Sequence, residues 1–109
     1  MLLSNMDSLP GYRIVRLLGL AQGNTIRAKH LGRDIAAGLK NLVGGEIKGY
    51  TELLSEARSE ATERMITQAR ELGANAVINV RFATSSVMQG AAELFAYGTA
   101  VQVEPAQER

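Results

Sequence analysis

The side chains that could carry metal or nucleophilic chemistry are few, because the 109-residue chain has no cysteine and a single histidine, His30. The lack of cysteine excludes a disulfide framework, a thiolate metal site and a cysteine nucleophile. One imidazole also excludes a two-histidine metal motif within one chain. His30 lies close to Lys29 and Arg33, whose positive charges disfavour a cation, so it is only a weak metal candidate.

Four glutamates form the second candidate group. Glu52, Glu56, Glu60 and Glu63 are spaced four, four and three residues apart, which places them in one stripe on a helix. Carboxylate oxygens suit calcium or magnesium, but such a stripe is more typical of a solvated helix surface. Glu60 is also one turn from Arg64 and can pair with it. With Glu46 as a further weak candidate, divalent-metal binding stays an alternative, and the sequence requires no cofactor.

Glycines and a charged pair form the third candidate group. Gly44 and Gly45 precede a predicted helix, whose first backbone amides can hold an anion. No Lys-Ser/Thr pair follows, which excludes a phosphate-binding P-loop. A tight turn at the glycines and an ion pair between Arg33 and Asp34 would explain much of this pattern without any ligand. The functional interpretation is a ligand pocket between subunits. The candidate ligand-binding residues are Arg33, Asp34, Gly44, Gly45 and Tyr50.

No enzyme signature is present. The chain has no G-x-S-x-G, H-E-x-x-H or dinucleotide-binding motif, and no nucleophile beside a base. We therefore expect no catalytic activity, with a composite site between chains around Arg33, Asp34 and Tyr50 as the alternative. The basic residues at 27–33 have no neighbouring aromatic side chain for base stacking, so nucleic acid is not an expected partner.

Charge and hydropathy limit the other partners. The net charge is only +1, and no apolar run reaches the roughly 18–20 residues that span a membrane. The first residues lack a basic segment followed by a long apolar stretch, as a signal peptide would have. We expect a cytoplasmic protein with no membrane partner.

The elements that must position these residues are expected to form one α+β domain over residues 1–109. The length fits a single domain, and 46% apolar residues are enough for a core. Hydrophobic spacing predicts the helices and alternation predicts the strands. Gln22-Gly23-Asn24 is typical of a turn, and Gly73 of a residue just beyond a helix. The predicted helices cover about 31–43 and 50–72, and the predicted strands about 12–20, 75–84 and 92–103.

The long helix has the clearest pattern, an apolar stripe at helical spacing. Its members are Tyr50, Leu53, Leu54, Ala57, Ala61, Met65, Ala69 and Leu72. In the strand that follows, alternation places Ala76, Ile78, Val80 and Phe82 on one face.

The last strand is apolar on both faces. Leu94, Ala96 and Ala100 alternate with a second set, Phe95, Tyr97, Val101 and Val103. A helix layer covers only one face of a small sheet, and we expect no other part of this chain to cover the second. We therefore assign that second set to an interface with another copy of the chain. The split charge agrees, with an excess of Lys and Arg in residues 1–49 and of Asp and Glu in residues 50–109.

Five stretches resemble the YbjQ-like family of small bacterial and archaeal proteins, in family order. They are Pro10–Val15, Gly32–Leu39, Val43–Glu46, Leu72–Val77 and Tyr97–Val101. The resemblance implies a two-layer β-α-β-β subunit, similar to the dodecin subunit, with helices on one face of an antiparallel sheet. It further implies a ring-shaped pentamer and a heavy-metal-binding label without agreed catalytic residues. The chain departs from many relatives at Ser4-Asn5, where a threonine pair is common.

Taken together, the residues and the resemblance predict a non-enzymatic homo-oligomer that binds a small ligand or ion at its interfaces or ring axis. A divalent or heavy-metal binder that uses carboxylate or histidine donors is the first alternative. An enzyme with an inter-subunit site is the second.

Overall fold

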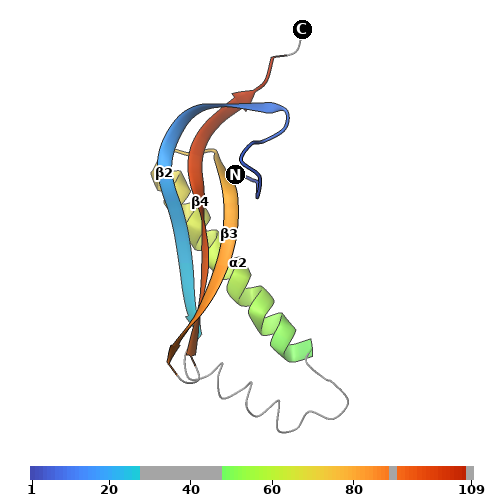
Figure 1. The fold of residues 1–109 in the computed structure, drawn as a ribbon, viewed down its shortest axis with the longest axis vertical. Helices are drawn as coiled ribbons and strands as arrows, with labels where there is room; N and C mark the ends of the chain where they lie inside the picture. The colour runs from blue at the N-terminus through green and yellow to red at the C-terminus, as the bar shows by residue number, and fades with distance from the viewer. Residues whose placement is uncertain (28–47, 89–90, 108–109) are drawn as a thin grey trace.

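The computed structural model describes residues 1–27, 48–88 and 91–107, which form one sheet with a helix across it (Figure 1). The elements are β1 (Leu2–Leu3), β2 (Tyr12–Arg27), α2 (Lys48–Glu71), β3 (Ala76–Met88) and β4 (Ala91–Pro105). The sheet order is β1-β3-β4-β2, with β1 parallel to β3 and the other pairs antiparallel. The α+β class and the helix on one face are confirmed, but the sheet is mixed because β1 runs parallel to its neighbour. The predicted helix at 31–43 lies outside the described residues.

Helix α2 buries the predicted stripe through its middle and C-terminal half. Ala57, Ala61, Met65 and Ala69 are fully or almost fully buried, and they recur every four residues. Leu72 lies beyond the helix and is 40% exposed, so its assignment to the stripe is wrong. The helix stops where Gly73 takes a left-handed φ of +88° and its amide donates to the carbonyl of Arg70 at 2.9 Å.

Small side chains allow α2 to approach the sheet closely. The helix-side core consists of Ala21, Ala61, Met65, Ala69, Val77, Ala96 and Ala100. At Gly23, an added Cβ would lie 2.3 Å from the carbonyl oxygen of Ala61 and 2.4 Å from the amide nitrogen of Met65. The turn predicted at residues 22–24 is therefore wrong: β2 continues through it, and the glycine is needed because the helix backbone lies against the strand.

A second core lies on the sheet face turned away from α2. Ala76, Ile78, Val101 and Val103 are buried there, and Leu9 packs against them from the segment between β1 and β2. The expectation that no other part of the chain covers this face is wrong at this end of the sheet. Leu9 reaches it because residues 4–11 cross from β1 on one edge of the sheet to β2 on the other.

A bulge in β3 changes which side chains share a face. Ile78 pairs with Thr99 and Arg81 with Tyr97, so Asn79 and Val80 together lie opposite Gly98 and β3 has one extra residue. Asn79 has a φ of +53°, a left-handed conformation that asparagine tolerates better than most residues. Strict alternation therefore fails after Ile78, and Phe82 pairs with Ala96 on the face that carries α2.

Candidate functional site

The structure places the predicted interface residues in two different environments. Phe95 and Tyr97 are partly exposed on the face away from α2, with ring centroids 5.2 Å apart and planes at 25°. Val101 and Val103 are instead buried in the chain's own core beside Leu9.

The predicted ligand and metal candidates lie mostly outside the described residues. This applies to His30, Arg33, Asp34, Gly44, Gly45 and Glu46. Tyr50 is in the first turn of α2, where the backbone is described and the side chain is not.

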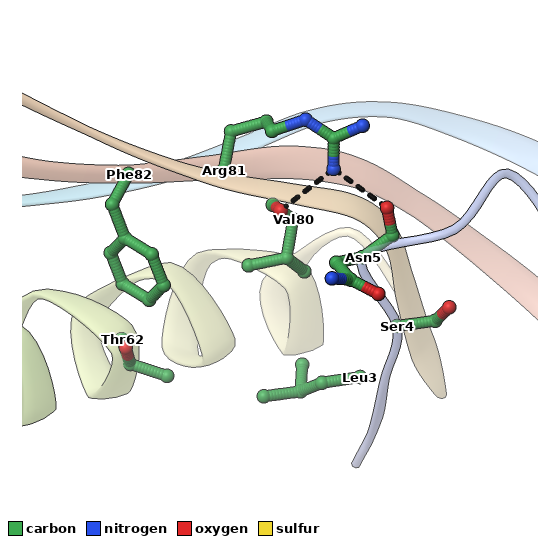
Figure 2. A pocket seen from close by; sticks show the side chains of 7 residues that line it. All are labelled: Leu3, Ser4, Asn5, Thr62, Val80, Arg81 and Phe82. Atoms are coloured by element: carbon green, nitrogen blue, oxygen red, sulfur yellow. Dashed lines mark hydrogen bonds between the residues drawn. The ribbon is translucent and has the colours of Figure 1, made fainter.

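A hollow of about 610 Å³ opens between the N-terminal segment, β3 and α2 (Figure 2). Thr62 faces it from α2, and Val80 and Phe82 face it from β3. This volume lies within the range that holds small organic ligands in proteins. The lining residues are Leu3, Ser4, Asn5, Thr62, Val80, Arg81 and Phe82.

The β3 bulge holds the N-terminal segment at the mouth of this hollow. The amide of Val80 donates to the carbonyl of Ser4 at 2.9 Å, and the amide of Asn79 donates to the carbonyl of Met6 at 2.8 Å. The two residues of the bulge thus make the hydrogen bonds with the segment beyond β1. Bulges often re-aim chain segments next to functional sites, and this one fixes the residues around Asn5.

The Arg81 side chain binds the backbone carbonyl of Asn5. Its Nη1 donates to the carbonyl oxygen of Asn5 at 2.6 Å and to that of Val80 at 3.0 Å (Figure 2). Ser4 adds a local turn, because its Oγ accepts from the amide of Met6 at 3.0 Å and donates to the carbonyl of Ser8 at 2.9 Å. The backbone around Asn5 is therefore held at several points.

A second hollow of about 520 Å³ adjoins the first, and both are lined by Thr62 and Phe82. Phe82, 49% exposed, lies between them. We name the two hollows together the Phe82 groove. The other residues of the second hollow are Ser55, Arg58, Ser59 and Glu63.

Charge is unevenly placed along the Phe82 groove. The second hollow has Arg58, whose Nη2 donates to Ser55 Oγ at 3.3 Å, and the exposed carboxylate of Glu63. Arg81 is the one charged residue among the described residues that line the first hollow, and its guanidinium lies on the opposite side of β3 from the side chains of Val80 and Phe82 (Figure 2). The described side chains that face the interior of the first hollow are thus apolar or uncharged polar ones.

The described residues do not fit a heavy-metal centre. They contain no group of three or more His, Cys, Asp or Glu side chains that could hold a metal ion. The first hollow offers amide and hydroxyl oxygens, whereas soft cations prefer thiolate and imidazole. In the acidic stripe of α2, Glu56 and Glu63 are exposed, and Glu60 is paired with Arg64 at 2.5 Å as predicted.

Comparison with known proteins agrees with this architecture. A family model with the description "Putative heavy-metal-binding" matches residues 1–104. The chain belongs to the YbjQ-like family. A UPF0145 protein of Hahella chejuensis is 69% identical over 104 residues, which cover 95% of this chain and 100% of that protein. A UPF0145 protein of Thermus thermophilus is 58% identical over 108 residues, covering 99% of this chain and 95% of the relative.

The fold is also similar to that of a solved protein. The crystal structure of a DUF74-family protein of unknown function from Pediococcus pentosaceus superposes with a TM-score of 0.63. That match covers 95% of this chain and 98% of the other, at 16% sequence identity, and so concerns the fold alone. No helix among the described residues is long and apolar enough to cross a membrane.

Sequence reasoning missed the residues of the first hollow. Asn5 was noted only as a departure from the YbjQ-like pattern, and Phe82 was placed by an alternation that the bulge interrupts. The departure at Ser4-Asn5 was the one available signal, because both residues line the hollow.

Proposed function

We propose that this YbjQ-like protein is a non-enzymatic homo-oligomer, a ring-shaped pentamer, that binds a small ligand at its subunit interfaces. The observation that carries the proposal is the apolar surface left on the sheet face away from α2. Leu17 and Leu20 of β2 are 71% and 75% exposed there, on the same face as Phe95 and Tyr97. Exposed leucines and aromatic rings gathered on one face of a sheet typically mark an interaction site.

The face of β2, rather than its outer edge, is the surface that a second copy would cover. The amide of Gln22 donates to Gln68 Oε1 at 2.6 Å, and Arg64 Nη1 donates to the carbonyl of Asn24 at 2.5 Å. Side chains of α2 thus already bind backbone groups of this edge strand. These groups are then not free to pair with a strand of another copy, which disfavours strand-to-strand association. The two bulges of β2, around Val15 and Leu18, also disfavour pairing of this edge with a strand of another copy.

The side chains of the first hollow of the Phe82 groove are suited to binding. Asn5 offers an amide, Thr62 a hydroxyl and Phe82 an aromatic ring, groups that can hold a small ligand. We therefore place the small-ligand function in this groove as well as at the predicted interfacial residues.

Native mass spectrometry of untagged protein, purified without chelator, tests the proposal. We expect a species near five times 11.7 kDa, roughly 58 kDa, with added mass that is lost on denaturation. The double variant L17E/L20E should dissociate this species, while L72E, which changes an exposed leucine beyond α2, should leave it intact. A monomeric wild-type protein would overturn the proposed assembly.

The family description makes heavy-metal binding the second candidate function. Its donors would be residues such as His30 and Glu46, outside the described residues. Calorimetry with a panel of divalent and soft metal ions should give a saturable isotherm that H30A or E46Q abolishes. Flat titrations across the panel would remove this candidate.

A further inference from the structure

We propose that the first hollow of the Phe82 groove binds an uncharged, planar molecule with an amide-type edge, meaning a hydrogen-bond donor next to an acceptor. Asn5 would recognise that edge, and Phe82 would pack against the ring. This inference deepens the proposed function by naming the ligand class. It requires ligand binding and does not depend on the number of subunits.

Asn5 supplies the polar half of this recognition. Its carboxamide holds one acceptor and one donor group side by side, the complement of another amide edge. The backbone of Asn5 is fixed by Arg81, and the bulge binds the flanking carbonyls of Ser4 and Met6. No hydrogen bond joins the Asn5 side chain to another described residue. A backbone held by hydrogen bonds therefore presents an exposed donor–acceptor pair that has no partner among the described residues.

Phe82 supplies the apolar half. Figure 2 shows its ring on the same side of β3 as Val80, above Thr62 of α2. Phe82 is about half exposed, and the side chains of Leu3 and Val80 extend the apolar lining toward Asn5. A flat ring placed between Phe82 and the helix would bury apolar surface on both, while its polar edge faces Asn5.

Among the described lining residues, no charged group is directed into this hollow, which disfavours an ion as its ligand. The Arg81 guanidinium is directed away from it toward the carbonyls of Asn5 and Val80. The carboxylate of Glu63 belongs to the adjoining hollow. An anion or a cation would lose its hydration here, and no described side chain aims an opposite charge at it, which is unfavourable. An uncharged ligand avoids this cost.

Calorimetric or NMR titration of the full chain with benzamide, benzoate and benzamidine tests the inference. These probes share one ring and differ in the charge and hydrogen-bonding groups of the edge. We expect benzamide to bind saturably, and benzoate and benzamidine to bind at least about tenfold more weakly. Equal affinity for benzamide and benzoate, or no binding of benzamide, would overturn the inference.

Variants assign the binding to the two residues. N5L keeps the approximate size of the side chain without its polar groups, and F82A removes the ring. Each should weaken benzamide binding by about tenfold or more, whereas T67A, on the exposed part of α2, should not. N5D should shift the preference toward benzamidine, because a carboxylate accepts two hydrogen bonds from an amidinium. Unchanged preference in N5D would show that Asn5 does not contact the probe.

The same preparation separates this inference from the proposed function. A pentamer that does not bind benzamide overturns the ligand class and leaves the assembly standing. A monomer that binds benzamide through Asn5 supports the ligand class and overturns the assembly.

Discussion

The side-chain amide of Asn75 makes both backbone hydrogen bonds of Val103. The amide of Val103 donates to Asn75 Oδ1 at 2.8 Å, and Asn75 Nδ2 donates to the carbonyl of Val103 at 2.9 Å. Asn75 lies just before β3 begins at Ala76. Its side chain therefore makes the hydrogen bonds to β4 that a backbone residue of β3 would make if the strand extended further. This contact gives a structural role to Asn75 within the Leu72–Val77 stretch that resembles the family.

Replacement of Asn75 should therefore reduce the stability of the fold. We expect N75A to lower the free energy of unfolding by about 2 kcal/mol, because two partly buried backbone groups lose their partners. Urea denaturation measures the change. N24A is the matched control, since the Asn24 side chain makes an exposed bond to Glu93 at 2.8 Å. A loss in N75A no larger than in N24A would contradict this role.

Gly23 should not tolerate a side chain. G23A places a Cβ against backbone atoms of Ala61 and Met65, so the helix must move away from the sheet. We expect a loss of about 2–3 kcal/mol in unfolding free energy, as for overpacking in a core. A21G, which removes a buried methyl group two residues away, should cost about 1 kcal/mol. Thermal denaturation of both variants compares them, and near-wild-type stability of G23A would show that α2 can shift freely.

On the sheet face away from α2, a negative charge at a buried position should reduce stability, whereas one at a partly exposed position should alter assembly. Val101 is 1% exposed, so V101E buries an unpaired carboxylate and should cost several kcal/mol whatever the oligomeric state. Y97E changes a partly exposed residue and should alter assembly with little effect on the fold. Chemical denaturation and native mass spectrometry separate the two effects. Equal destabilisation by both variants would contradict the division of this face.

Arg81 should act as a positioning residue for Asn5. R81A removes the bond to the Asn5 carbonyl but leaves the ring of Phe82 in place. We expect faster hydrogen exchange at the amides of Ser4 and Asn79, which anchor the N-terminal segment. Benzamide binding should weaken while the overall melting temperature changes little. R70A, in the last turn of α2, is the control, and unchanged exchange at Ser4 in R81A would contradict the role.

Much of the fold was predictable because its determinants are local. The spacing of Ala57, Ala61, Met65 and Ala69 defines one face of a helix, whatever packs against it. Alternation likewise separated Ala96 and Ala100, which pack under α2, from Val101 and Val103 on the other face. The i,i+4 pair of Glu60 and Arg64 follows from helix geometry in the same way.

The candidate site was not predictable, because its residues meet only through long-range pairing. Asn5, Thr62 and Phe82 are far apart in the chain and have no shared motif. A strand-like pattern does not show where a bulge will form, yet the bulge at Asn79 decides that Phe82 faces α2 and that Arg81 faces away.

The sequence by itself determined the α+β class, the buried stripe of α2, the two-faced character of β4 and the family. Each of these depends on periodicity or on residues close together in the chain. Only the tertiary structure decided the continuation of β2 through Gly23, the cover of Val101 by the segment containing Leu9, and the Phe82 groove. These features arise from the close approach of distant segments, and steric fit between segments is invisible to a local pattern.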